Sequence, residues 1–170
     1  PALLAAHPIC DTTWSLHDLL KAGRAAESAT LTLLERTPDV ANNTSLRVAA
    51  AHAAPATVIA KLIAYMPGSV HAKDGQGLLP LHHAAMAGGA RRKIAHLVSL
   101  AQQSEEVTKA AVEAVRLLLE ASPDAALVKG GNKGTALDYA KHYQAPQEVR
   151  DLLYASMHDA FGNPLWTQGR

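Results

Sequence analysis

Pairs of aliphatic residues recur along the chain, and a proline follows each pair at a constant distance. The second residue of each pair stands four positions before the proline. The pairs with their prolines are Leu33-Leu34 with Pro38, Leu62-Ile63 with Pro67, and Leu118-Leu119 with Pro123. Proline lacks an N–H group and disfavours helical geometry in the residue before it. The pattern therefore predicts three aliphatic helices, each of which stops near its proline.

A second pattern alternates with the first, in which a leucine is followed three positions later by a small or aliphatic residue. The leucines are Leu16, Leu46, Leu81 and Leu137. They predict short helices whose alanines, such as Ala49 and Ala84, allow neighbouring helices to approach closely. The residue numbers of these leucines differ by 30, 35 and 56. Two steps are close to a repeat of about 33 residues, whereas the third exceeds it by about 23, which predicts an insertion in the third unit.

The residues around these leucines resemble the ankyrin repeat, whose first helix carries the motif Thr-Pro-Leu-His-x-Ala-Ala. Residues 79–85 read Leu-Pro-Leu-His-His-Ala-Ala and depart from the motif only at the threonine position. Residues 135–140 are similar to a terminal variant of the motif, and Asp74–Gly77 looks like the family's hairpin turn. The second unit is degenerate, because Arg47 stands where the motif has histidine.

The resemblance implies an all-α, ankyrin-type solenoid of helix–turn–helix repeats with a concave face of inner helices. We expect an N-terminal extension (1–11), a repeat domain (12–157) and a C-terminal tail (158–170). The predicted units are 12–44, 45–74, 75–131 with an insertion at about 89–108, and 132–157. The insertion is interpreted as an additional surface helix or, alternatively, as a protrusion that contacts a partner. His82 is implied to be a structural histidine that ties a first helix to a neighbouring turn.

The implied function is non-catalytic. Positions five and six after the motif leucine face the groove of an ankyrin array, and such a surface binds another protein. We expect partner contacts at His52, His142 and Tyr143, and also at Lys21, while Met86 either contacts the partner or packs against the adjacent unit. The alternative is a regulatory or docking domain of a larger enzyme or signalling protein whose catalytic part is absent from this chain.

Candidate chemistry in the sequence does not form a catalytic, metal or cofactor site. The nine histidines contain no His-x-x-x-His pair, and there is one cysteine, whereas zinc needs three or four converging ligands. His7 and Cys10 lack a third group that would orient a base. The glycine-rich run 129–135 lacks the order of a phosphate-binding loop. Arg91–Lys93 is a single basic cluster without interleaved aromatic residues, so we expect no nucleic-acid binding.

Composition and charge support a compact helical protein. Alanine and leucine make up a third of the 170 residues, 48% of residues are hydrophobic, and the net charge is +1. No run of 18 apolar residues occurs, so we expect no membrane-spanning segment. The single Cys10 favours a reducing compartment, and hence a cytoplasmic or nuclear location. Because the chain begins at Pro1 without methionine, we expect it to be part of a longer protein.

The tail contains the only phenylalanine and one of two tryptophans of the chain. Phe161, Leu165 and Trp166 are grouped too closely to remain in water without a reason. We expect residues 158–170 to fold back and cap the last unit. The alternative is a short linear motif that docks on a partner.

Overall fold

A computed structural model describes residues 16, 19–20, 30–31, 43–87, 101–131 and 134–158 of the chain. Within these residues the fold is all-helical, and an isolated β-type bridge joins Gly130 to Gly134. The α-helices are α3 (Asn43–Ala51), α4 (Ala56–Tyr65), α5 (Pro80–Ala87), α6 (Ala101–Ala121), α7 (Ala136–His142) and α8 (Gln147–Met157). Two 3-10 helices are η3 (Pro67–His71) and η5 (Pro123–Leu127). The predicted all-α class is confirmed for this part of the chain.

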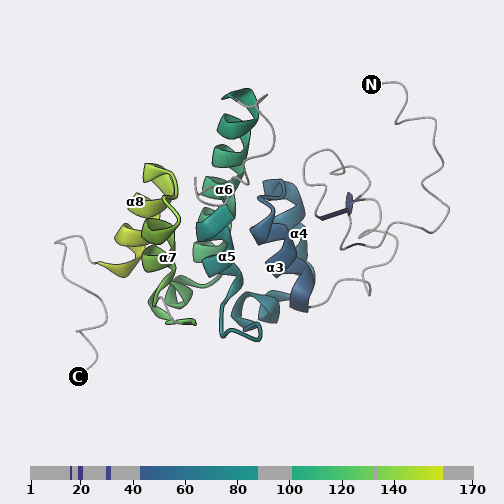
Figure 1. Cartoon of the computed structure of the whole chain (residues 1–170). Helices are drawn as coiled ribbons and strands as arrows, with labels where there is room; N and C mark the ends of the chain where they lie inside the picture. The colour runs from purple at the N-terminus through teal and green to yellow at the C-terminus, as the bar shows by residue number, and fades with distance from the viewer. Residues whose placement is uncertain are drawn as a thin grey trace.

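The six helices form three adjacent pairs, α3 with α4, α5 with α6, and α7 with α8 (Figure 1). Helix α5 lies between α3 and α7, and helix α6 lies between α4 and α8. The pairs therefore build two layers. We call α3, α5 and α7 with their hairpins (43–54, 72–87 and 128–145) the first-helix layer. The second-helix layer comprises α4, α6, α8, η3 and η5 (55–71, 101–127 and 146–158).

One hydrophobic core runs through all three pairs. Leu46, Leu81 and Leu137 of the first-helix layer are at most 7% exposed, and Leu62, Leu118 and Leu153 hold the equivalent place in the second. Leu16 and Leu20 from the preceding segment join the same core. Ala49, Ala84 and Ala140 of the first helices are fully buried, which lets these helices pack closely.

The predicted helix stops are confirmed at two of the three prolines. Helix α4 ends at Tyr65, two residues before Pro67, and helix α6 ends at Ala121, two residues before Pro123. Each proline then begins a 3-10 helix, which the sequence pattern did not indicate. Proline suits the first position of such a turn, because the missing N–H would have no partner there. The third proline, Pro38, lies outside the described residues.

The turns that join α3 to α4 and α7 to α8 have the same construction. Ala53 and Gln144 adopt positive φ angles of 49° and 56°. The following alanines, Ala54 and Ala145, donate backbone hydrogen bonds to the carbonyls five residues earlier, at 2.9 and 2.8 Å. A proline comes next in each turn and precedes the second helix. This arrangement closes the end of each first helix and reverses the chain direction.

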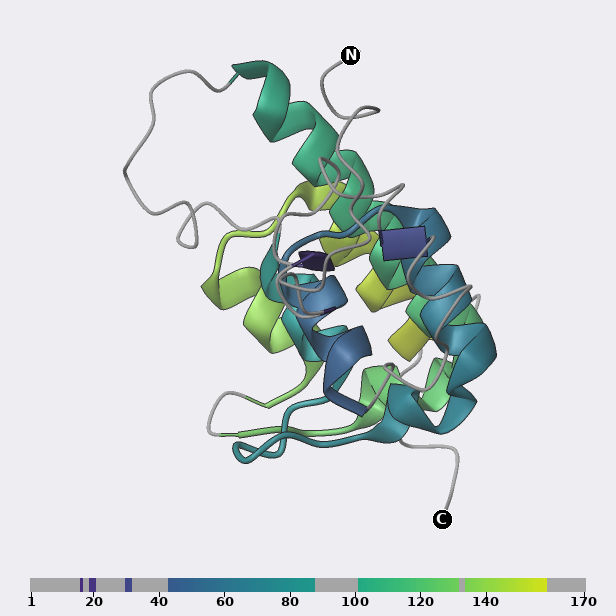
Figure 2. The ribbon, with the colours of Figure 1, turned by 90° about the vertical axis from the view of Figure 1, so that its right-hand side faces the viewer.

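Two hairpin turns precede α5 and α7. Asp74 N–H donates to the Leu78 carbonyl at 3.0 Å, and Gly130 N–H donates to the Gly134 carbonyl at 3.0 Å in the equivalent place. The predicted turn at Asp74–Gly77 is confirmed by a bond from Gly77 N–H to the Asp74 carbonyl. The hairpins lie side by side (Figure 2), so closely that a Cβ added to Gly130 would be 2.7 Å from the Gly77 carbonyl oxygen.

Helix α6 has 21 residues, whereas α4 and α8 have 10 and 11. Its first turns project beyond the two layers (Figure 1). The residues equivalent to the start of α4 begin at Val112, so the extension comprises residues 101–111. The described part of the predicted insertion therefore belongs to one continuous helix that begins at residue 101. The rest of the insertion, 89–100, lies outside the described residues, as do the predicted extension (1–11) and the tail from Asp159 onward.

Candidate functional site

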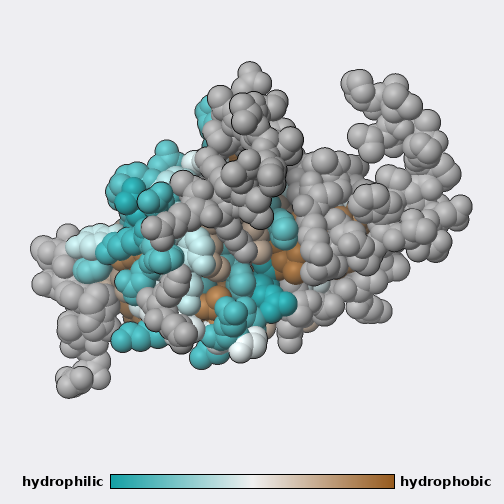
Figure 3. Space-filling view, in the orientation of Figure 1, coloured by the Kyte–Doolittle hydropathy of each residue, from teal (hydrophilic) through white to brown (hydrophobic). Residues whose placement is uncertain are grey.

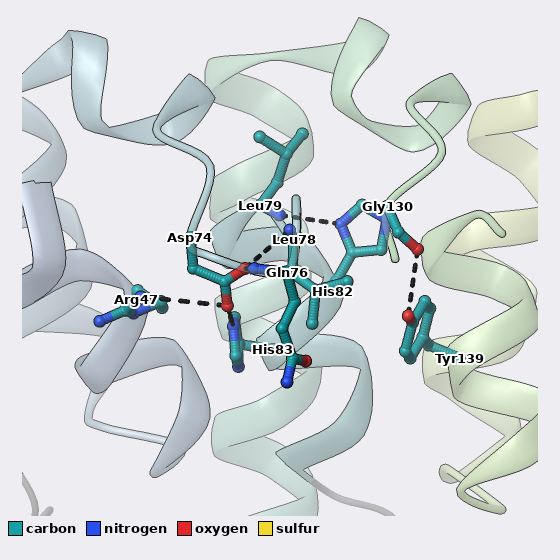
Figure 4. A network of polar contacts seen from close by, with 9 residues as sticks. All are labelled: Arg47, Asp74, Gln76, Leu78, Leu79, His82, His83, Gly130 and Tyr139. Atoms are coloured by element: carbon teal, nitrogen blue, oxygen red, sulfur yellow. Dashed lines mark hydrogen bonds and ion pairs between the residues drawn. The ribbon is translucent and has the colours of Figure 1, made fainter. Parts of the chain in front are cut away.

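A carboxylate organises the first hairpin. Asp74 Oδ1 accepts hydrogen bonds from the backbone N–H groups of Gln76 at 2.8 Å and Leu78 at 2.9 Å. Asp74 Oδ2 lies 2.9 Å from Nε2 of His83 in α5 (Figure 4). These contacts fix the hairpin on the helix that follows it. Burial raises the pKa of Asp74, but the hydrogen bonds from Leu78, His83 and Gln76 outweigh it, so the pKa lies below its usual value.

Arg47 connects the same carboxylate to the preceding helix pair. Its Nη1 atom lies 3.9 Å from Asp74 Oδ2, and the Arg47 side chain is 30% exposed (Figure 4). Arg47 follows Leu46 as His82 follows Leu81, so the two residues occupy equivalent places. At this equivalent place α3 carries a longer cation, which reaches the next hairpin. A partly exposed ion pair of this kind contributes little to the free energy of unfolding.

His82 is fully buried between α5 and the second hairpin. Its Nδ1 atom accepts a hydrogen bond from the backbone N–H of Leu79 at 3.2 Å. Its Nε2 atom faces the backbone around Gly130 without a well-formed hydrogen bond in the described part of the chain. Burial lowers the pKa of His82 below its usual value, although backbone contacts with Gly134 and Val128 act in the opposite direction. The Nδ1 bond therefore holds the start of α5, and the expected tie to a neighbouring turn remains a prediction.

Tyr139 repeats in the last pair what His83 does in the middle pair. Its hydroxyl donates to the carbonyl oxygen of Gly130 at 3.0 Å. The step in residue number from His83 to Tyr139 equals the step from Asp74 to Gly130. In both pairs, the second residue after the motif leucine holds the first residue of its own hairpin. Tyr139 also contacts His82 edge-to-face, with ring centroids 5.4 Å apart.

A small apolar cluster separate from the main core lies between α5 and α7. It consists of Leu78, Met86 and Tyr139, with Tyr143 packed against them. The ring of Tyr143 stacks on Tyr139 with centroids 6.5 Å apart, and His142 contacts Tyr143 edge-to-face at 5.1 Å. The aromatic rings therefore continue from the buried interior to the exposed end of α7.

The expected partner-contact residues fall into different environments. His52 and His142 are exposed, and Tyr143 is half-buried. Met86 is 5% exposed and packs between α5 and α7, where Tyr139 and Tyr143 cover it, which is the second of the two roles expected for this residue. The structure brings Met86, His142 and Tyr143 together, whereas His52 follows α3 at the other side of the layer. Lys21 lies outside the described residues.

The described residues offer no metal-ligating group of three or more histidine, cysteine, aspartate or glutamate side chains. The glycine-rich run before α7 is used for capping. Thr135 Oγ1 accepts a hydrogen bond from the Asp138 N–H at 3.4 Å, and Asp138 Oδ2 accepts one from the Thr135 N–H at 2.9 Å, which forms a capping box. Among the helices of known placement, none is both long and apolar enough to cross a membrane.

Sequence reasoning missed Arg47, Asp74 and Tyr139 as residues that hold the pairs together. The signal that could have found two of them is the step in residue number between Leu81 and Leu137. The same step relates Asp74 to Gly130 and His83 to Tyr139. The residue types differ at each step, so a comparison of letters alone does not reveal the relationship.

Comparison of the chain with protein-family models, with curated proteins and with solved structures finds no match.

Proposed function

We propose that the chain is a non-catalytic repeat domain of the ankyrin type that binds another protein through its first-helix layer. The proposal is supported by three helix pairs in register and by hairpins that lead into α5 and α7. It is also supported by the buried His82, whose Nδ1 atom accepts from the residue at the motif's threonine position. Residues with shared structural roles recur at the spacings of the motif leucines, as a repeat array with one insertion requires.

The observation that carries the binding proposal is the contrast in exposure between the two ends of the first helices α3 and α7. The motif leucines and alanines are buried, whereas the positions that follow them reach the surface as His52 after α3 and His142 in the last turn of α7. Tyr143 is half-buried and supported from below by Tyr139. Amphipathic side chains on a rigid scaffold are typical of protein interfaces, because little conformational entropy is lost when they bind.

Site-specific crosslinking tests this proposal. A photoreactive amino acid is placed at position 52 or 142, and in a control at Glu120, which is exposed on the second-helix layer. In lysate we expect positions 52 and 142 to crosslink to the same protein, and position 120 to give no such product. Crosslinks of equal yield from position 120, or different proteins from positions 52 and 142, would contradict binding through the first-helix layer.

A further inference from the structure

The described charged side chains divide unequally between the two layers. The first-helix layer carries four cations and two carboxylates, namely Arg47, Lys73, Lys129 and Lys141 with Asp74 and Asp138. The second-helix layer carries four cations and seven carboxylates, namely Lys61, Lys109, Arg116 and Arg150 with Glu105, Glu106, Glu113, Glu120, Asp124, Glu148 and Asp151. Among the described residues, the first-helix layer therefore carries a net positive charge and the second-helix layer a net negative charge, although the whole chain is nearly neutral.

Both carboxylates of the first-helix layer are occupied by donors within the protein. Asp74 accepts from two backbone N–H groups and contacts His83, and Asp138 accepts from the N–H and hydroxyl of Thr135. Asp74 also lies 3.9 Å from Arg47. Neither carboxylate is therefore placed to pair with Lys73, Lys129 or Lys141.

The described lysines of this layer, Lys73, Lys129 and Lys141, are exposed. Lys73 immediately precedes Asp74, and Lys129 immediately precedes Gly130, so the two occupy equivalent positions on the neighbouring hairpins. Lys141 is exposed in the last turn of α7, next in sequence to His142 and Tyr143. Lys141 therefore lies beside the aromatic end of α7, and Lys73 and Lys129 lie on the two hairpins that precede α5 and α7.

Cations of the second-helix layer are matched differently. Lys109 lies 3.1 Å from Glu105, and Arg116 lies 3.2 Å from Glu113, all within α6. After these pairs are formed, the described residues of the second-helix layer still carry more carboxylates than cations. In the view of Figure 3 the described surface is mostly hydrophilic with small separate hydrophobic patches. Polar and charged contacts can therefore contribute to the specificity of partner binding.

From this charge division we infer that the partner docks on the first-helix layer with an acidic segment of a protein. The inference rests on the proposed function and specifies the chemistry of the partner. Glutamate and aspartate side chains of the segment meet Lys73, Lys129 and Lys141, while an apolar side chain packs on the supported ring of Tyr143. An acidic segment is attracted to this layer and repelled by the second-helix layer, which selects the docking face during encounter.

A random-peptide display library selected on the immobilised full chain tests the inference. We expect the selected peptides to be enriched in aspartate and glutamate. Binding of a labelled selected peptide should weaken about tenfold or more in the double variant Lys73→Glu, Lys129→Glu. It should also weaken as the salt concentration rises from about 50 to 500 mM, because exposed charges are screened.

The matched control is Lys109→Glu on α6, which should bind as the parent does. Circular dichroism and melting temperature show that each variant is folded.

The outcomes separate the two proposals. Neutral or basic peptides that crosslink to position 142 would overturn the acidic segment and leave the proposed function intact. Acidic peptides that lose binding in Lys109→Glu but not in the double variant would place the site on the other layer and overturn both. A single-stranded oligonucleotide that displaces the peptides, and that the double variant no longer binds, would make the layer a general polyanion site and overturn a protein partner.

Discussion

The hydroxyl group of Tyr139 donates a hydrogen bond to the carbonyl oxygen of Gly130 at 3.0 Å, and both groups are buried. The same place in the preceding pair is filled by His83 and Asp74 at 2.9 Å. A phenol on a carbonyl and an imidazole on a carboxylate thus perform one structural task, the attachment of a hairpin to its helix. The position in the repeat is retained while the chemistry changes.

Tyr139→Phe should lower the free energy of unfolding by about 1 kcal/mol, because it leaves the Gly130 carbonyl without its donor and keeps the ring in place. The measurement is urea denaturation followed by circular dichroism. Tyr154→Phe is the matched control, since Tyr154 is 50% exposed, and it should change stability by less than about 0.5 kcal/mol. Equal effects of the two substitutions would show that the hydroxyl bond contributes no stability.

The paired leucines near the end of α6 differ in burial. Leu118 is fully buried, whereas Leu119 is half-buried at the margin of the core. Leu118→Ala should therefore cost about 2–5 kcal/mol, and Leu119→Ala should cost clearly less, because the loss grows with the buried volume removed. Chemical denaturation of both variants gives the comparison. A Leu118→Ala midpoint equal to that of Leu119→Ala would contradict the packing of α6.

Much of this core was predictable, because its signals are local. Proline ends a helix through its own missing N–H, so the ends of α4 and α6 follow from the positions of Pro67 and Pro123. The spacing of the leucines also indicates which face of each helix is buried, as Leu62 and Leu118 confirm. Hydrophobic periodicity indicates which face of a helix is buried, and this signal does not depend on which elements pack against that face.

Contacts between pairs were less accessible to prediction. Leucine spacing placed Met86 at a groove position, but its burial depends on Tyr139 and Tyr143 from another helix pair. Arg47 was interpreted only as a departure from the histidine of the motif, although it reaches Asp74 in the next hairpin. Such contacts depend on side-chain length and on the exact approach of two elements, and neither quantity is encoded in the hydrophobic period.

Protonation should weaken the contact between α5 and the second hairpin. The folded state holds the pKa of His82 below the usual histidine value of about 6.5, whereas the unfolded chain restores it. The unfolded state therefore binds more protons as the pH falls through about 6.5, and the free energy of unfolding decreases. Asp74 adds a second loss at more acidic pH, through its lowered pKa, below the usual aspartate value of about 3.9.

Urea denaturation between pH 7.5 and 5.5 measures the histidine effect. His82→Gln keeps a side-chain oxygen that can accept the Leu79 N–H, but it cannot be protonated, so the slope of stability against pH should become smaller. His142→Ala, which removes an exposed imidazole, serves as the control and should retain more of the slope. An unchanged slope in His82→Gln would assign the pH dependence to other groups.

The two helix–helix turns offer a test in the stabilising direction. Ala53 and Gln144 have positive φ angles, a backbone region that costs a residue with a side chain roughly 1 kcal/mol and costs glycine little. Ala53→Gly and Gln144→Gly should therefore maintain or raise the free energy of unfolding by up to about 1 kcal/mol, despite the greater freedom of glycine in the unfolded chain.

Ala60→Gly is the matched control, because Ala60 is exposed inside α4, where glycine costs about 1 kcal/mol. In thermal and chemical denaturation, Ala60→Gly should be less stable than the parent protein. Both turn variants should be as stable as the parent or more stable. A loss of stability in Ala53→Gly as large as that in Ala60→Gly would contradict a left-handed residue at the end of α3, and with it the shared construction of the two turns.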